Sequence, residues 1–280
     1  MFDRIPAGAL ALAAAMLMTI APAPAHDESK YPDWSGMWRR PPGVGIQWDE
    51  TKPPGLAQQA PLKPEFQKVL EDSIAEQKAG GQGGDFRVRC ISNGMPRLMT
   101  IIRQHEIFIT PWVTLVVYEN NLPRRIYTDG RDFTAEDNVP SYAGYSIGKW
   151  LDTDGDGRYD TLEVETRNFK GPRNYEQSGI PLHPDGETIV KERLYLDKAD
   201  RNTMLNEITV IDNALTRPWT VVKHYRRQRE HTWYEDLCSE NNNHVQIGNE
   251  GYMLSADGYL MPTKKDQSPP DLRYFKKAGQ

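Results

Sequence analysis

Acidic residues between positions 152 and 163 have the spacing of a calcium-binding loop. Carboxylate side chains occupy five positions of the segment DTDGDGRYDTLE: Asp152, Asp154, Asp156, Asp160 and Glu163. Counted from Asp152 they take positions 1, 3, 5, 9 and 12, with Gly157 at position 6, which is the ligand spacing of an EF-hand loop. The backbone carbonyl of Arg158 at position 7 would complete an oxygen-only ligand set of the kind that calcium prefers. The segment therefore predicts a calcium site.

The sequence on either side of this loop predicts strands, at 145–150 and 161–169, where an EF-hand has helices. Strands held in a sheet cannot change their angle as the helices of a calcium sensor do, so we expect a structural ion. The alternative is a solvated Asp-Gly hairpin, in which the carboxylates would repel one another. A strand that begins at Thr161 would turn Glu163 away, and the shorter pattern ending at Asp160 would remain.

A second candidate site consists of polar side chains in three predicted strands. Alternation places Arg125, Tyr127 and Asp129 on one face of their strand. We expect these residues, with Glu165 and His224 from other strands, to line one interior cavity that binds a small molecule. Carboxylate, tyrosine and guanidinium groups in such a cavity could also perform acid–base chemistry. The alternative is a set of surface ladders of opposite charge.

Composition and the N-terminus indicate where the protein acts. The net charge is −5, from 34 basic and 39 acidic residues, which argues against nucleic acid as a partner. Residues 1–25 resemble a secretory signal peptide, because an apolar run too short to span a bilayer precedes Ala23-Pro24-Ala25. We expect the mature chain to begin at His26 and to be periplasmic or secreted, with no transmembrane segment after signal removal. An uncleaved anchor is the alternative.

The only two cysteines, Cys90 and Cys238, are far apart in the chain. In an oxidising compartment such a pair most simply forms one disulfide, and we predict that bond here. The alternative is a pair of buried free thiols.

The elements expected to position these groups are mainly strands. Residues 26–84 predict an extended arm followed by one helix after Pro64, with Phe66, Val69, Leu70 and Ile74 on its buried face. Residues 85–280 predict a barrel domain with a C-terminal tail that wraps its outside. Eight segments alternate with period two: 105–110, 113–119, 124–129, 145–150, 161–169, 187–197, 203–212 and 219–228. Short connections without helices predict an antiparallel β-barrel or curled sandwich.

Three tryptophans of the arm, Trp34, Trp38 and Trp48, have two interpretations. They could stack on a sugar or aromatic ligand, or they could plug one end of the barrel. We expect the plug.

Several motifs resemble those of an uncharacterised family of exported bacterial β-rich proteins. They are PDWSGMW, CISNGMPRLM, RRIYTDGR and RPWTVVKHYRRQ, and the similarity covers nearly the whole mature chain. The resemblance implies no specific activity. It implies that the acidic loop elaborates a hairpin that is usually a short Trp-Glu-Gly-Asp turn. Separately, Gly36-Met37-Trp38 is similar to the Gly-x-Trp signature of lipocalins, whose barrels hold small apolar ligands.

Three functions are compatible with these features. The protein is an exported barrel that binds a small molecule, an enzyme of the cyclase, isomerase or hydrolase type, or an envelope module without a ligand. A deep cavity lined by Arg125, Tyr127, His224 and Glu165 would favour the first two, and a close Glu–Arg–Tyr cluster with a strongly shifted pKa would favour the enzyme. A solid apolar interior would favour the third. The sequence leaves the oligomeric state open.

Overall fold

A computed structural model describes residues 27–100, 103–134, 139–230, 232–234, 237–240, 242–248 and 250–270. The predicted signal peptide and the predicted mature N-terminus at His26 lie outside these ranges. Within these ranges, no helix combines the length and the apolar character needed to cross a membrane.

Nine strands close into a barrel in which each strand pairs with the next along the chain and β9 pairs with β1. The strands are β1 (Met37–Arg39), β2 (His105–Ile109), β3 (Val113–Tyr118), β4 (Arg124–Tyr127), β5 (Tyr145–Leu151), β6 (Thr161–Arg167), β7 (Ile189–Leu196), β8 (Thr203–Ile211) and β9 (Trp219–Gln228). The predicted fold class, a mainly β barrel with one helix before its main run of strands, is confirmed. The eight predicted strands correspond to β2–β9.

Two features of the barrel differ from the sequence-based expectation. The short strand β1 comes from the Pro- and Gly-rich arm and closes the barrel between β9 and β2. The barrel is also mixed, because β4 and β5 are parallel, with Ile126 opposite Ser146 and Tyr127 opposite Ile147. Every other pair of neighbouring barrel strands is antiparallel.

Most connecting segments gather at one end of the barrel, which we call the covered end: residues 40–62, 85–104, 168–188 and 212–218. This segment set includes the short 3-10 helices η2 (Gly55–Gln58), η3 (Phe86–Arg89) and η4 (Arg97–Thr100). Trp48, Tyr175 and Trp219 pack their rings together there, with centroids 5.1–6.2 Å apart. Trp34 and Trp38 are buried elsewhere in the core, Trp38 within β1 and Trp34 against Trp150 of β5, so Trp48 alone packs at the covered end as the expected plug would.

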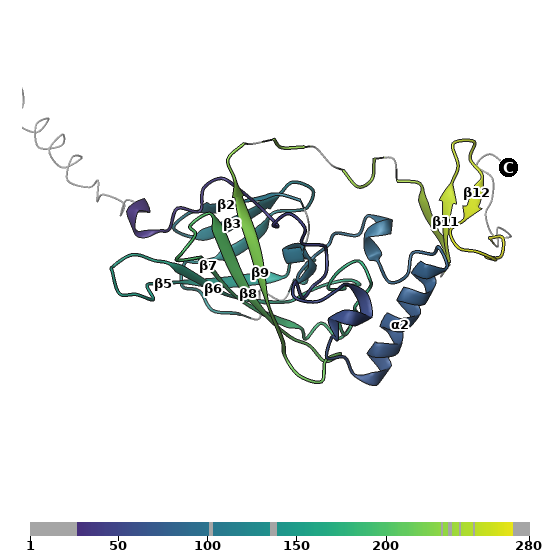
Figure 1. Ribbon diagram of the computed structural model, residues 1–280, viewed down its shortest axis with the longest axis horizontal. Helices are drawn as coiled ribbons and strands as arrows, with labels where there is room; N and C mark the ends of the chain where they lie inside the picture. The colour runs from purple at the N-terminus through teal and green to yellow at the C-terminus, as the bar shows by residue number, and fades with distance from the viewer. Residues whose placement is uncertain are drawn as a thin grey trace, which may run out of the picture.

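The helix α2 (Pro64–Lys78) lies outside the covered end (Figure 1). Leu70 is buried, and Phe66 and Ile74 pack against the core, as the helical period predicts. Val69 was also expected on this face, but it is 48% exposed. The buried face instead continues through Ser73, whose hydroxyl donates a hydrogen bond to the carbonyl of Ser178 at 2.7 Å and so anchors the helix.

The C-terminal part forms a separate three-stranded sheet of β10 (His244–Ile247), β11 (Glu250–Leu254) and β12 (Leu260–Pro262). It lies near the end of α2, away from the barrel (Figure 1). The Cys90–Cys238 disulfide, with Cα atoms 5.4 Å apart, joins the segment before this sheet to the covered end. The predicted disulfide is therefore present.

Candidate functional site

The acidic loop joins β5 to β6 at the end of the barrel opposite the covered end. The amide of Asp160 donates to the carbonyl of Leu151 at 2.9 Å and closes the hairpin. The amide of Tyr159 donates to the carbonyl of Lys30 at 2.7 Å, which attaches the base of the loop to the N-terminal segment. The acidic residues thus project from a fixed base.

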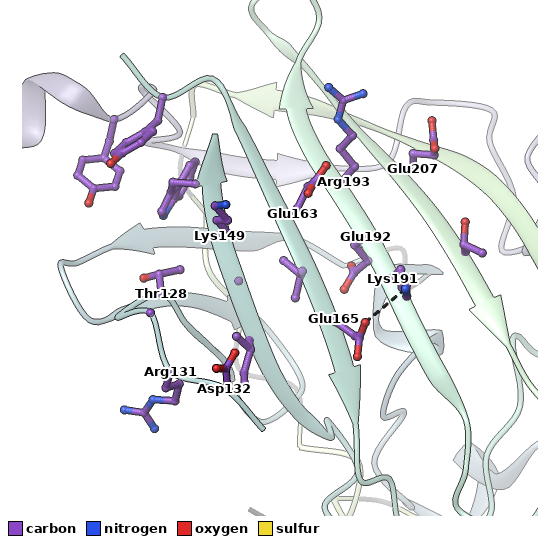
Figure 2. A pocket seen from close by; sticks show the side chains of 18 residues that line it. Thr128, Arg131, Asp132, Lys149, Glu163, Glu165, Lys191, Glu192, Arg193 and Glu207 are labelled. Atoms are coloured by element: carbon purple, nitrogen blue, oxygen red, sulfur yellow. Dashed lines mark ion pairs between the residues drawn. The ribbon is translucent and has the colours of Figure 1, made fainter. Parts of the chain in front are cut away.

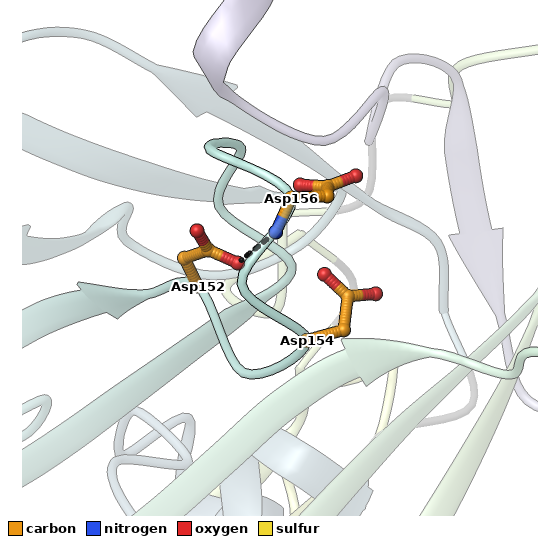
Figure 3. Close-up of side chains that lie close together, drawn as sticks. All are labelled: Asp152, Asp154 and Asp156. Atoms are coloured by element: carbon orange, nitrogen blue, oxygen red, sulfur yellow. Dashed lines mark hydrogen bonds between the residues drawn. The ribbon is translucent and has the colours of Figure 1, made fainter.

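Three carboxylates of the loop come together. One oxygen each from Asp152, Asp154 and Asp156 lie within 4.8 Å of one another, and all three residues are exposed (Figure 3). Asp152 organises the turn, because its carboxylate accepts hydrogen bonds from the amides of Gly155, Asp156 and Gly157 at 2.7–3.2 Å. The glycines permit this path, since both have positive φ, +75° and +86°. This acidic triad could hold a metal ion.

The other predicted ligands are placed differently. Oδ2 of Asp160 accepts hydrogen bonds from the amide and the hydroxyl of Thr153, at 3.2 and 2.6 Å, and joins the two sides of the loop. Oδ1 of Asp160 is buried without a hydrogen-bond partner of good geometry. Glu163 lies on the outer face of β6, opposite Lys149 and Arg193. The structure thus brings together the first three acidic residues of the loop and leaves Glu163 on the strand.

The outer face of β5–β8 carries a surface ladder of opposite charges, the arrangement expected as the alternative to a lined cavity. Lys149, Glu163, Arg193 and Glu207 are direct cross-strand neighbours with alternating charge (Figure 2). Glu165 pairs with Lys191 in the next row, with Oε2 and Nζ 3.5 Å apart. An open cleft of about 790 Å³ covers this face, with Tyr31 and Tyr159 among its lining residues. Balanced charge makes the cleft a polar surface without a preferred ligand charge.

The five side chains expected inside the barrel lie on its outer face. Arg125 is exposed, as is Asp129 just after the end of β4, and Tyr127, Glu165 and His224 are half-buried. Asp129 forms an ion pair with Arg131, whose guanidinium stacks 3.9 Å from the centroid of the Tyr127 ring. The expectation of one interior cavity lined by these residues is wrong. Alternation was assigned correctly but the inner face was not, and ligand binding by these residues stays a prediction.

The opposite strand faces supply the interior, which is unusually polar. Arg124 and Glu192 form a buried ion pair, with Nη1 and Oε1 3.1 Å apart. Ser146, Thr166 and Asn206 complete their hydrogen bonds at 2.8–3.2 Å. Tyr118 lies beside this pair, and burial raises the pKa of its hydroxyl. The sequence contained a signal for this polar interior. Arg124 and Arg125 lie on opposite faces of their strand, so an arginine would point inward whichever face lined the barrel.

A second buried group lies nearer the covered end. Nζ of Lys223 donates to the carbonyls of Gln47, at 3.1 Å, and of Trp48. Burial, and secondarily the Arg40 guanidinium, lowers the pKa of Lys223 to about 7. Arg40 in turn pairs with Glu50, with Nη2 and Oε1 3.2 Å apart. These charges fix the arm to the inner face of β9.

No model of a known protein family matches the chain, and searches of curated proteins and of solved structures give no match either. The fold defines a closed β-barrel protein that could bind a ligand, with an acidic triad that could bind a metal ion. The resemblance to exported β-rich proteins and to lipocalins stays a prediction.

Proposed function

We propose that this protein is an exported β-barrel whose β5–β6 loop binds one calcium ion with a structural role. The convergence of Asp152, Asp154 and Asp156 within 4.8 Å carries the proposal. The donor set contains oxygen only, which suits calcium and does not suit zinc or copper. The carbonyl of Arg158 and the carboxylate of Asp160 would supply further ligands.

A structural role is favoured over a sensor role by the elements that flank the loop. β5 and β6 pair over their whole lengths, from Tyr145 opposite Arg167 to Leu151 opposite Thr161. Such a ladder cannot open as a helix pair does. The ion would neutralise carboxylates that otherwise repel and would stiffen the end of the hairpin.

Isothermal titration calorimetry with calcium chloride tests the proposal. We expect one ion to bind with a dissociation constant of roughly 10⁻⁴–10⁻³ M, as in extracellular calcium modules. Magnesium should bind more weakly, because it requires a tighter octahedral site. Absence of calcium binding at millimolar concentration would reduce the loop to an acidic turn. A large change in circular dichroism on calcium addition would instead support a sensor.

Export is supported by the N-terminal sequence and by the disulfide, which suits an oxidising compartment. Mass spectrometry of protein recovered outside the cytoplasm should find an N-terminus at His26. Abundant peptides that span Ala25 and His26 would contradict cleavage there.

Small-molecule binding is the second part of the proposed function. A closed barrel of this kind could hold a ligand. At the centre of this barrel, however, the inward side chains of Arg124, Glu192 and Asn206 are buried and bonded to one another. A ligand is therefore better accommodated near an end of the barrel than at its middle.

An enzymatic role is the alternative, and one observation favours it. Glu192, Arg124 and Tyr118 form the close carboxylate–guanidinium–phenol cluster that acid–base chemistry would use. All three are at most 3% exposed, and Glu192 is saturated by Arg124 and Asn206. We therefore favour an ion-pair core. Detection of substrate turnover that Glu192→Gln abolishes without unfolding the chain would reverse this preference.

A further inference from the structure

A cavity at the covered end of the barrel is lined mainly by basic and amide side chains. Its volume is about 210 Å³, and its walls come from the arm, residues 87–103, the β3–β4 turn and the β6–β7 connection. Three arginines line it, Arg87, Arg97 and Arg103, together with the amides Asn93 and Asn120. Such a set offers many hydrogen-bond donors with positive charge in a confined space.

The local structure holds two of these arginines in place. Asp85 caps η3 by accepting a hydrogen bond from the amide of Arg87 at 3.0 Å. The same carboxylate binds the guanidinium of Arg97 at 2.6 Å, and the Asn174 carbonyl oxygen binds it at 2.8 Å. The neighbouring Cys90–Cys238 disulfide fixes the end of η3. The backbone that carries Arg87 and the side chain of Arg97 are thus fixed by contacts within the chain.

Arginines outnumber acidic residues among the described residues that line the cavity. Among the lining residues that the structure describes, Glu176 is the one acid, and its carboxylate already accepts hydrogen bonds from the amide and the hydroxyl of Ser178. Burial raises the pKa of Glu176 above its ordinary value. The described lining residues thus carry three guanidinium groups and one carboxyl group, and Asp85, which is not among them, pairs with the guanidinium of Arg97.

A fourth arginine gives independent support. Arg173 lines a small hollow that shares Arg87, Asn93 and Arg97 with the cavity. Arg173 is 7% exposed, and its Nε and Nη1 atoms are buried without a hydrogen-bond partner among the described residues. Buried guanidinium donors without acceptors are energetically costly. An anion near this cluster would lower that cost.

We infer that this cavity binds a small molecule carrying carboxylate or phosphate oxygens. Planar guanidinium groups pair with both kinds of oxyanion, and the two amides add neutral donors. The volume admits a small metabolite and excludes large apolar ligands. The inference rests on the proposed small-molecule binding, which it places at the covered end, and it is independent of the calcium loop.

Calorimetry of the full chain in calcium-free, low-salt buffer tests the site with four probes. Succinate and inorganic phosphate represent the two oxyanions, succinamide is the neutral analogue of succinate, and Nile red reports neutral apolar binding. Arg87→Gln and Arg103→Gln remove lining charges, and Arg201→Gln removes an exposed arginine in the β7–β8 turn as the matched control. Thermal melting of each variant checks that it is folded.

We expect at least one oxyanion to bind and succinamide not to bind. Arg87→Gln and Arg103→Gln should each weaken binding about tenfold or more, as loss of a charge-assisted hydrogen bond does, and Arg201→Gln should leave it unchanged. Binding of succinate alone, or of phosphate alone, identifies the oxyanion. If neither succinate nor phosphate bound at about 10 mM, or if both bound all variants equally well, the proposed site would be wrong. Nile red binding without oxyanion binding would overturn it too, while leaving the ligand-binding role of the barrel intact.

Discussion

Arg124 on β4 and Glu192 on β7 form a buried ion pair at the centre of the barrel, although 68 positions separate them in the chain. Both side chains are at most 1% exposed, and besides bonding to each other they are hydrogen-bonded to the interior residues Ser146, Thr166 and Asn206. Burying two charges is offset only when their partners are complete. Substitution of either partner should therefore strongly lower the free energy of unfolding.

Glu192→Gln should destabilise the protein strongly, because it leaves the Arg124 charge buried without a counter-ion. We expect a loss of about 3–5 kcal/mol in the free energy of unfolding, measured by urea titration. The double variant Arg124→Met/Glu192→Leu should recover much of that loss, since it removes both charges. Asp72→Asn, which breaks the exposed ion pair with Lys68 on α2, should cost at most about 0.5 kcal/mol. Equal losses in the two single variants would contradict the role of burial.

His105 should make the protein sensitive to mild acid. Burial lowers the pKa of His105 to about 4, from its ordinary 6.5, and its ring packs 4.9 Å from that of Tyr225. Below pH 6.5 the unfolded chain binds a proton that the folded chain does not, so stability falls as pH decreases towards 4. Between pH 7.5 and 5 this residue should account for about 2 kcal/mol of the loss. His105→Phe should show a correspondingly smaller loss over this interval, and an unchanged pH profile would contradict a neutral buried imidazole.

Lys223 should make the stability of the fold depend on pH above neutrality, whereas His105 does so below it. Its pKa of about 7 lies below the ordinary 10.5, so between these values the unfolded chain binds the extra proton. Stability contributed by this group therefore rises with pH above 7, and the penalty for the buried charge is complete below 7. From pH 7 to 9 the wild type should gain about 2 kcal/mol relative to Lys223→Met. Urea unfolding at both pH values measures this difference, and parallel curves would rule it out.

The strands of this interior could be predicted from the sequence, but which of their faces points inward could not. Period-two alternation located all the long strands and correctly divided their residues into two faces. It did not identify the inner face, because a basic residue, Arg124 or Lys223, occupies the inner face where an apolar residue is the usual choice. The compensating partners, Glu192 and the carbonyls of residues 47 and 48, are distant in the chain and become visible only in the fold.

Other features depended on information outside any local pattern. The strand β1 is three residues long and follows a turn at Gly36, so only pairing with β2 and β9 makes it a strand. The cavity at the covered end gathers residues from segments spread between positions 46 and 177. By contrast, the acidic loop is local, and its spacing alone predicted that Asp152, Asp154 and Asp156 would lie together.

Removal of the disulfide should destabilise the chain and loosen the covered end. Cys90 and Cys238 close a loop spanning 148 positions, which restricts the unfolded chain. The double variant Cys90→Ala/Cys238→Ala should lose about 2–5 kcal/mol in the free energy of unfolding. A reductant should lower the stability of the wild type and leave that of the variant unchanged. Oxyanion binding should weaken in the variant, because η3 carries Arg87; full stability without the bond would contradict its structural role.

Variants of the acidic loop should separate the residues that bind calcium from their neighbours. Asp154→Asn and Asp156→Asn each remove a triad charge while preserving shape, and both should abolish the calcium-dependent rise in melting temperature. At ten times the dissociation constant the ion stabilises the wild type by about 1.4 kcal/mol, a rise of about 2–4 °C.

Glu163→Gln is the matched control, because that side chain lies on the outer face of β6 between Lys149 and Arg193. It should keep most of the rise, since the triad does not include it. Asp152→Asn should lower stability even without calcium, because Asp152 accepts three backbone hydrogen bonds that form the turn. Differential scanning calorimetry with and without calcium measures all four variants. If Glu163→Gln abolished the calcium effect and Asp154→Asn did not, the ion would bind at the base of β6, and the triad would be only a polar turn.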